Sequence, residues 1–148
     1  MKQTYSTNGS YAQRRKRSLL YFLPSLGIMI AIFILSSRTS SDMNVLLPFF
    51  QSIFPNMKSF DWGHFVAYFA LAFSLDYGFG RRADRLHFKL LIVLLCGAYG
   101  LTDEYHQTFV GGRTPDIYDI RNDCIGAAIA MIVVAIPPIH RVWRRGAN

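Results

Sequence analysis

Apolar residues in this chain fall into long runs that short clusters of charged residues separate. The first run, residues 18–37, carries no charge over 20 residues, the length that a helix needs to cross the hydrocarbon core of a bilayer. Three more apolar stretches of similar length run from about 61–80, 86–107 and 115–136. The pattern predicts an all-α integral membrane protein built as a bundle of four spanning helices.

Residues 44–54 are apolar but too few to span a bilayer. The large apolar side chains of this segment recur at the spacing of one helical face, at Leu46, Phe49, Phe50, Ile53 and Phe54. A helix of this kind lies in the membrane interface. We therefore expect a short interfacial helix between spans 1 and 2, with a lid over a binding site as the alternative.

Two proline positions indicate how the spans begin. Pro24 falls in the early turns of the first run, where a proline costs least. Thr114, Pro115 and Asp116 suit a helix start, as a capping residue, a first-turn proline and a first-turn acid. A cleaved signal peptide is the alternative for the first run. That run is longer than the usual apolar core of a signal, and no A-x-A site follows it.

Charge sets the predicted orientation. Hydrophobic residues make up 51% of the 148 residues, yet the formal net charge is +7. Most of the 16 Lys and Arg residues lie in the N-terminal tail, the 81–89 loop and the C-terminal tail. The positive-inside rule therefore places both termini in the cytoplasm. We expect a basic cytoplasmic tail, residues 1–17, before one transmembrane domain, residues 18–148, in a multi-pass membrane protein.

A nucleic-acid partner and a disulfide framework are both disfavoured. The basic cluster Arg14–Arg17 directly precedes a predicted span, so no nucleic-acid partner is expected and the lipid bilayer is the expected partner. Cys96 and Cys124 lie in or beside apolar runs, and two cysteines in such places do not indicate a disulfide framework.

Polar side chains gather at one end of the last three predicted spans, away from the basic loops. They recur on one helical face, as Asp61, His64 and Tyr68 do at i, i+3 and i+7. Because ionisable groups at this depth face the bundle interior, the three faces are predicted to meet in an outward-facing polar pocket. The predicted ligand-binding residues are Asp61, His64, Asp103, Glu104, Gln107, Arg113, Asp119, Asn122 and Asp123.

Each part of this pocket also has a purely structural interpretation. His64 alone suits a hydrogen-bonding helix residue, and Asp119 suits a first-turn acid favoured by the helix dipole. Asp103, Glu104 and Arg113 suit an ion pair at the membrane interface. The whole set favours function, because burying so many carboxylates is costly and stability alone does not require them.

Asp76 lies apart from the predicted pocket, near the opposite end of its span. Arg81 and Arg82 follow it closely along the chain. Pairing with these arginines, or snorkelling of the side chain to the interface, is therefore predicted for Asp76.

The segment TDEYHQTFVGGRTPDIYDIRNDCIGAAIA, residues 102–130, resembles the signature of the VanZ-like family of bacterial membrane proteins. That signature has an Asp-Glu pair, a Gln three residues later, an arginine after a short loop, and then Asp, Asn and Gly. The matching positions are Asp103, Glu104, Gln107, Arg113, Asp119, Asn122 and Gly126.

Two further segments resemble the same family. Asp61 and His64 match its Asp-x-x-His element, and Ser36 with Ser37 matches a serine pair that closes the first span. Trp62 stands where the family often has Lys. The family takes its name from a protein associated with teicoplanin resistance. The resemblance therefore implies a location in the bacterial inner membrane and a role in the cell envelope that touches glycopeptides or lipid-linked precursors, and it implies no reaction.

Four classes of function stay open from the sequence, the last of them a membrane scaffold. The first is a binding protein for an amphiphilic ligand, a lipid-linked precursor or a glycopeptide. The second is an outer-leaflet enzyme with His64, oriented by Asp61, as general base and Glu104 as acid, or with Asp103, Glu104, Asp119 and Asp123 holding a divalent cation. The third is a proton-linked transporter. No resident metal or cofactor is expected, and no Gly-x-Ser-x-Gly, His-Glu-x-x-His or P-loop motif is present.

Overall fold

The computed structural model describes residues 19–53 and 61–146, so the predicted N-terminal tail lies outside the described residues. The described residues form helices and no strand. The elements are α2 (Leu23–Ser36), α3 (Ser40–Ile53), α4 (Asp61–Phe79), the 3-10 helix η1 (Gly80–Asp84), α5 (Leu86–Gln107), α6 (Ile117–Ala135) and α7 (Pro137–Gly146). The predicted all-α class is confirmed.

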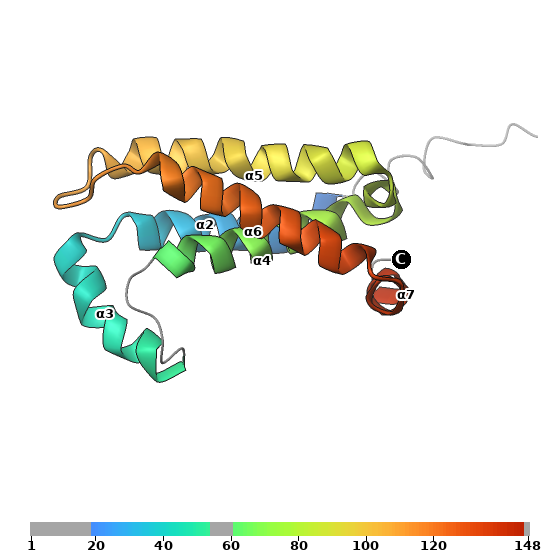
Figure 1. Ribbon diagram of the computed structural model, residues 1–148, viewed down its shortest axis with the longest axis horizontal. Helices are drawn as coiled ribbons and strands as arrows, with labels where there is room; N and C mark the ends of the chain where they lie inside the picture. Colours follow the sequence, from blue (N-terminus) through green and yellow to red (C-terminus); the bar gives the residue numbers. More distant parts are fainter. Residues whose placement is uncertain (1–18, 54–60, 147–148) are drawn as a thin grey trace, which may run out of the picture.

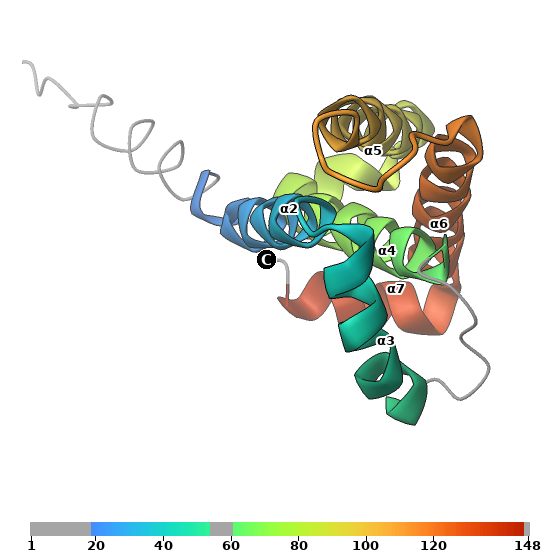
Figure 2. The same cartoon turned by 90° about the vertical axis from the view of Figure 1, so that its left-hand side faces the viewer.

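Helices α2, α4, α5 and α6 run side by side along the long axis of the molecule (Figure 1). α4 packs most extensively against α6, and it also contacts α2 and α5. α3 projects from one end of this bundle, and α7 lies across the other end (Figures 1 and 2). The bundle brings the ends of α4, α5 and α6 together, which the predicted site requires.

Helix length and exposure bear on membrane insertion. In the described part of the chain, α5 is long and apolar enough to cross a bilayer. Only 22% of its apolar 18-residue stretch is buried within the molecule. α6 and α7 together are also long and apolar enough to cross a bilayer, if the 88° bend between them is a break within one span. α5 therefore is a candidate span whose exposed leucines favour a lipid environment. The four-span topology with both termini in the cytoplasm stays a prediction.

The helix predicted over residues 18–37 is shorter in the structure. α2 begins at Leu23 with Pro24 in its first turn, and Tyr21 and Phe22 form a turn before it. A proline lacks the N–H that would continue a helix and clashes with the carbonyl four residues earlier, so the helix restarts there. α2 has 14 residues, about 21 Å of helix at 1.5 Å per residue. It ends at the predicted serine pair, where Ser37 Oγ donates to Phe33 O.

The start of α6 also differs from the prediction. Asp116, not Thr114, is the capping residue, and its carboxylate accepts a hydrogen bond of 2.8 Å from the Tyr118 N–H. The helix therefore begins at Ile117, two residues later than expected. A carboxylate at this position accepts a hydrogen bond from a free N–H and interacts favourably with the helix dipole.

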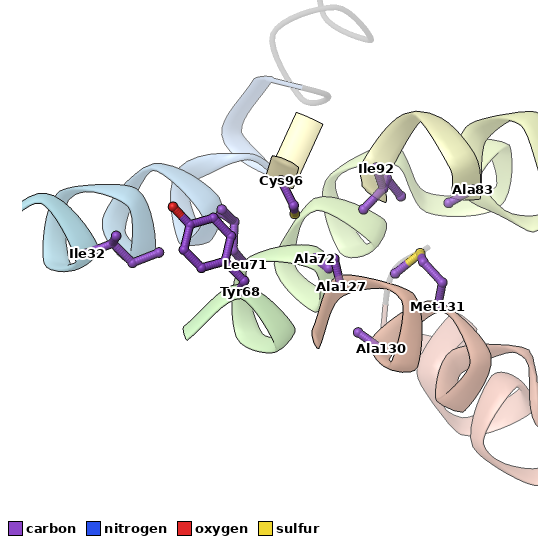
Figure 3. Close-up of a cluster of buried hydrophobic side chains, with 10 residues drawn as sticks. All are labelled: Ile32, Tyr68, Leu71, Ala72, Ala83, Ile92, Cys96, Ala127, Ala130 and Met131. Carbon is purple, nitrogen blue, oxygen red and sulfur yellow. The ribbon is translucent and has the colours of Figure 1, made fainter. Parts of the chain in front are cut away.

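Small residues let the central helices approach closely. A Cβ added to Gly126 of α6 would overlap with Phe65 O in the backbone of α4. A Cβ on Gly97 of α5 would lie 2.8 Å from Cys124 Sγ of α6. Both cysteines are free, as expected. Figure 3 shows the apolar cluster that fills the bundle between its two polar ends, formed by Ile32, Tyr68, Leu71, Ala72, Ala83, Ile92, Cys96, Ala127, Ala130 and Met131.

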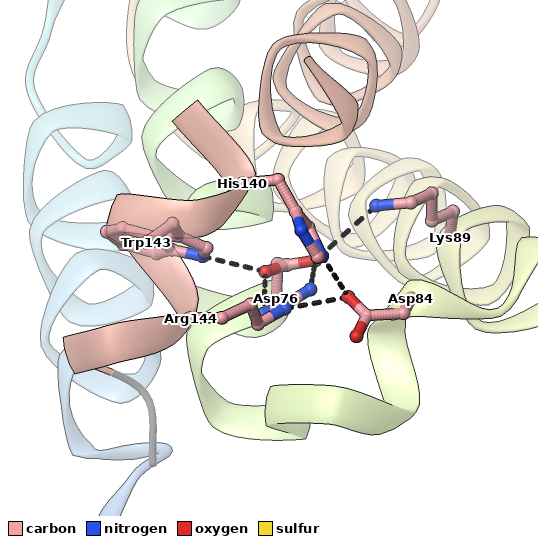
Figure 4. A network of polar contacts seen from close by, with 6 residues as sticks. All are labelled: Asp76, Asp84, Lys89, His140, Trp143 and Arg144. Carbon is pink, nitrogen blue, oxygen red and sulfur yellow. Dashed lines mark hydrogen bonds and ion pairs between the residues drawn. The ribbon is translucent and has the colours of Figure 1, made fainter. Parts of the chain in front are cut away.

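α7 is an element that the sequence analysis treated as a tail. Ile136 adopts an extended conformation after α6, and Pro137 and Pro138 then open a new helix. The guanidinium of Arg144 donates to both oxygens of Asp76, at 2.7 and 3.1 Å, and to Asp84 at 2.7 Å (Figure 4). These bonds fix α7 against α4 and η1.

The same network corrects the prediction for Asp76. Its side chain is fully buried and does not snorkel. The partners are Arg144, Lys89 at 3.7 Å and the indole N–H of Trp143 at 2.8 Å, rather than the nearby Arg81 and Arg82 (Figure 4). We name Asp76, Asp84, Lys89, His140, Trp143 and Arg144 the α7 network.

α3 confirms the expected helix between the first two apolar runs. It starts four residues earlier than predicted, because Thr39 and Asp42 cap each other reciprocally: Thr39 N–H donates to the carboxylate and Asp42 N–H donates to the hydroxyl. Val45 and Phe49 are exposed. The other apolar side chains on which the interfacial face was predicted lie outside the described residues, so its membrane contact stays a prediction.

Candidate functional site

Six polar side chains from three helices meet at the end of the bundle opposite α7. We name this group the polar cluster: His64 of α4, Asp103, Glu104 and Gln107 of α5, and Asp119 and Asp123 of α6. One ligand atom each from His64, Glu104 and Asp119 lies within 4.8 Å of the others. The convergence that the spacing predicted is therefore present.

His64 stands between two carboxylates of α6. Its Nε2 lies 4.0 Å from Asp119 Oδ2, and its Nδ1 lies 3.4 Å from Asp123 Oδ1. The α6 residues are spaced i and i+4, which places both on the face toward α4. The imidazole is 13% exposed, Asp119 is 19% exposed and Asp123 is fully buried. One side of the ring thus faces a buried carboxylate, and the other faces a more accessible one.

The last turns of α5 supply a hydrogen-bonded group. Gln107 Nε2 donates to Glu104 Oε1 at 3.2 Å and lies 3.5 Å from Asp103 Oδ2. All three side chains are almost completely buried. The amide therefore holds the two carboxylates on one side of the helix.

The 108–116 loop is fastened to this group. Arg113 Nε donates to Gln107 Oε1 at 3.0 Å, and the Asp116 N–H donates to Glu104 Oε2 at 2.8 Å. Gly112 has a positive φ of 75°, a conformation that favours glycine and turns the chain back toward α6. The loop backbone and Arg113 thus border the polar cluster.

Several buried polar atoms in and beside the polar cluster lack a hydrogen-bond partner. Among the described residues they include both carboxylate oxygens of Asp123, Asp103 Oδ1, His64 Nδ1 and the hydroxyl of Tyr68. Asp123 rests against Gly100, where an added Cβ would overlap with its Oδ2. Buried polar atoms normally have partners, so this concentration of unpartnered atoms indicates a place for a ligand, an ion or water.

Three carboxylates of the polar cluster lack a neighbouring Lys or Arg ion-pair partner among the described residues. In the part of the chain that the structure describes, no Lys or Arg lies within ion-pair distance of Asp103, Glu104 or Asp123. Arg113 bonds to the neutral Gln107 instead, so the predicted structural ion pair with Asp103 and Glu104 is absent there. Chemically, the arrangement can accept bonds from amines and hydroxyls, hold a cation, or use His64 as a base.

Of the two remaining predicted site residues, Asn122 makes a contact outside the polar cluster and the side chain of Asp61 is not described. Asn122 Oδ1 accepts a bond of 3.3 Å from Arg121 on its own helix. Asp61 is the first residue of α4, but its side chain lies outside the described residues. The ligand-binding role of all nine predicted residues stays a prediction.

The sequence analysis missed the backbone contribution of Asp116. Its N–H is the donor to Glu104, and its side chain caps α6, so the same residue ties the loop to two helices. An acid directly before the first turn of a helix is the signal that could have identified it.

A family model described as VanZ/LLP1 matches residues 3–138. That stretch includes every residue of the polar cluster. No curated protein and no solved structure shows a significant match to the chain.

Proposed function

This chain belongs to the VanZ/LLP1 family, and from that membership we propose that it is a multi-pass inner-membrane protein that binds an amphiphilic envelope molecule in the polar cluster. The ligand would be a lipid-linked precursor or a glycopeptide, and binding would link the protein to glycopeptide resistance. The family is membrane-associated, and α5 is a candidate span, which supports the location.

One observation carries this proposal: His64, Glu104 and Asp119 converge from three helices, beside buried carboxylate oxygens without donors. Carboxylates accept hydrogen bonds from amines and sugar hydroxyls, which glycopeptides and lipid-linked precursors both present. The apolar surface of α5 beside the polar cluster suits the acyl or prenyl chain of such a ligand.

Arg113 would recognise an anionic group of the ligand. Its Nε is occupied by Gln107, which orients the guanidinium and leaves its terminal nitrogens for a diphosphate or carboxylate. The loop that carries it is fixed to Glu104 through Asp116. Ligand contacts with the carboxylates and with the arginine would thus be coupled through one short segment.

Native mass spectrometry of the full chain in detergent tests the proposal, with a polyprenyl-diphosphate-linked sugar and teicoplanin as separate probes. We expect a bound mass with at least one probe, weakened about 10- to 100-fold in Arg113→Ala, since a charged hydrogen bond contributes about 1.5–3 kcal/mol. Arg38→Ala is the matched control, because Arg38 is an exposed arginine directly after α2. Equal retention by both variants, or no bound mass with either probe, would overturn the proposal.

The position of His64 favours a second candidate, an enzyme of the outer leaflet. Asp123 Oδ1 lies 3.4 Å from His64 Nδ1, where a carboxylate can orient a general base, and Glu104 is close enough to act as an acid. Incubation with a labelled polyprenyl-diphosphate substrate would yield a product that His64→Gln abolishes. Recovery of unchanged substrate from the wild-type protein would exclude this activity for that substrate.

Transport receives no comparable support. Along α4, the buried residues between His64 and Asp76 include Leu71 and Ala72, and the Ser74 hydroxyl donates to the helix carbonyl of Leu71. Tyr68 (Figure 3) and Ser74 are the buried polar side chains of this segment, and two such widely spaced groups disfavour a proton path through α4.

A further inference from the structure

We propose that His64, Glu104 and Asp119 bind a divalent transition-metal ion of the zinc or manganese class. The sequence analysis expected no resident metal, and its alternative cation site used four carboxylates without the histidine. The structure favours a mixed site, because it brings one imidazole and two carboxylates from three different helices together.

The ligand atoms lie at separations that an ion can bridge. His64 Nε2 and Asp119 Oδ2 are 4.0 Å apart, and the largest separation in the set is within 4.8 Å. Ligands about 2.1 Å from a tetrahedral zinc ion lie about 3.4 Å from each other. Side-chain adjustments of about 1 Å would therefore close the three residues around an ion.

Asp123 supplies independent support for a metal. It is fully buried, neither of its oxygens has a hydrogen-bond partner among the described residues, and Oδ1 lies 3.4 Å from His64 Nδ1. Histidines that bind a metal through one ring nitrogen usually donate the other N–H to a carboxylate, which fixes the ring. Asp123 is placed for that role, and it leaves Nε2 for the ion.

The electrostatics of the polar cluster also call for a cation. Asp103, which is 4% exposed, is close enough to interact electrostatically with His64 and Asp123. Asp103, Glu104 and Asp123 thus lie near one imidazole without a Lys or Arg ion pair in the described ranges. Uncompensated charges at this depth are costly, and a divalent ion would offset that cost.

The donor set narrows the class of metal. An imidazole suits zinc and other transition metals, whereas magnesium and calcium prefer oxygen ligands alone. Three protein ligands leave at least one coordination position open, as in catalytic zinc sites. An anionic group such as a diphosphate could occupy that position, and in this respect only the inference rests on the proposed function.

Metal titration of the full chain tests the inference. The protein, purified with a histidine-free tag and stripped with EDTA, would be titrated with ZnCl2, MnCl2 and MgCl2, and its bound metal measured by inductively coupled plasma mass spectrometry. We expect stoichiometric binding of zinc or manganese in preference to magnesium. His64→Gln and Glu104→Gln should abolish it, and Asp123→Asn should weaken it about 10- to 100-fold.

His87→Gln is the matched control, because His87 is an exposed histidine at the opposite end of α5. Cobalt absorption spectra of the wild-type protein give a second readout that requires no variant. Failure of the stripped wild-type protein to bind zinc or manganese, or equal binding by His64→Gln and His87→Gln, would overturn the inference. If the protein binds metal but neither amphiphilic probe, the metal site is upheld and the proposed ligand is contradicted. If it binds a probe but no metal, the proposed ligand is upheld and the metal site is contradicted.

Discussion

Arg144 of α7 and Asp76 of α4, 68 residues apart in the chain, form a buried ion pair through two hydrogen bonds. Arg144 also reaches Asp84, and Lys89 approaches Asp76 from α5. The pair therefore connects the C-terminal helix to the centre of the bundle. Breaking such a pair leaves a buried charge without compensation, so its loss should be costly.

Asp76→Asn is expected to destabilise the protein by about 3 kcal/mol, the lower part of the range for a broken buried ion pair. The lower value applies because Asp84 still accepts a bond from Arg144. Denaturant unfolding in mixed micelles measures the effect. Arg145→Ala, at an exposed position of the same helix, serves as the control and should change stability by no more than about 0.5 kcal/mol. Equal effects of the two variants would contradict the role of the pair.

Acidification should release α7. Partial burial disfavours ionised Asp84, but hydrogen bonds from His140 and Arg144 outweigh it and hold the pKa of this carboxyl below its usual value. A lowered folded-state pKa stabilises the fold above the unfolded-state value of about 4, and this stabilisation is lost as the pH falls through the folded-state pKa. Trp143 fluorescence, measured in a Trp62→Phe background, should report release in that acid range.

Asp84→Asn provides the comparison for the acid transition. This variant should lack the part of the pH dependence that comes from Asp84, and its α7 should already be less firmly held at neutral pH. An unchanged Trp143 transition in Asp84→Asn would show that another group controls the release.

Gly126→Ala should destabilise the protein by about 1–3 kcal/mol, because the added methyl group overlaps with Phe65 O and forces α4 and α6 apart. Gly27→Ala is the matched control in α2, where an added Cβ meets no atom within 4 Å. It should stabilise the helix by up to about 1 kcal/mol through helix propensity. Melting temperatures in detergent should therefore shift in opposite directions, and a shared direction would contradict the close approach of α4 and α6.

Asp116→Ala should cost about 1 kcal/mol by removing the cap of α6. The backbone N–H that bonds to Glu104 is kept in this variant, so the loop should remain attached. Hydrogen exchange would then increase at the Tyr118 amide and stay slow at residue 116. Rapid exchange at both amides would indicate that the cap also holds the loop.

The sequence predicted α4 and α5 closely because their limits coincide with changes in charge. The 86–107 prediction agrees with Leu86–Gln107, and the 61–80 prediction exceeds Asp61–Phe79 by one residue. The meeting of His64, Glu104 and Asp119 was predictable for a related reason. Side chains on one face of each helix must converge if all three faces avoid lipid.

The sequence did not reveal which of several suitable residues pairs with Asp76 or which of two caps α6. Arg81 and Arg82 are close to Asp76 along the chain, but the bend after α6 brings Arg144 to it instead. Likewise, Thr114 and Asp116 both suit a cap, and only the position of the backbone decides between them. Periodicity identifies faces, whereas long-range pairing and helix ends depend on the tertiary arrangement.

The apolar cluster of the bundle keeps its two polar ends out of electrostatic contact along α4, and this separation has a genetic consequence. Alleles that disrupt the α7 network should lower the amount of protein in the cell. Isosteric substitutions at His64 or Glu104 should leave the amount of protein unchanged and remove the cellular function that depends on the polar cluster. A saturation mutagenesis library scored for protein abundance and for cellular function would therefore place substitutions at the two ends of the molecule in different classes.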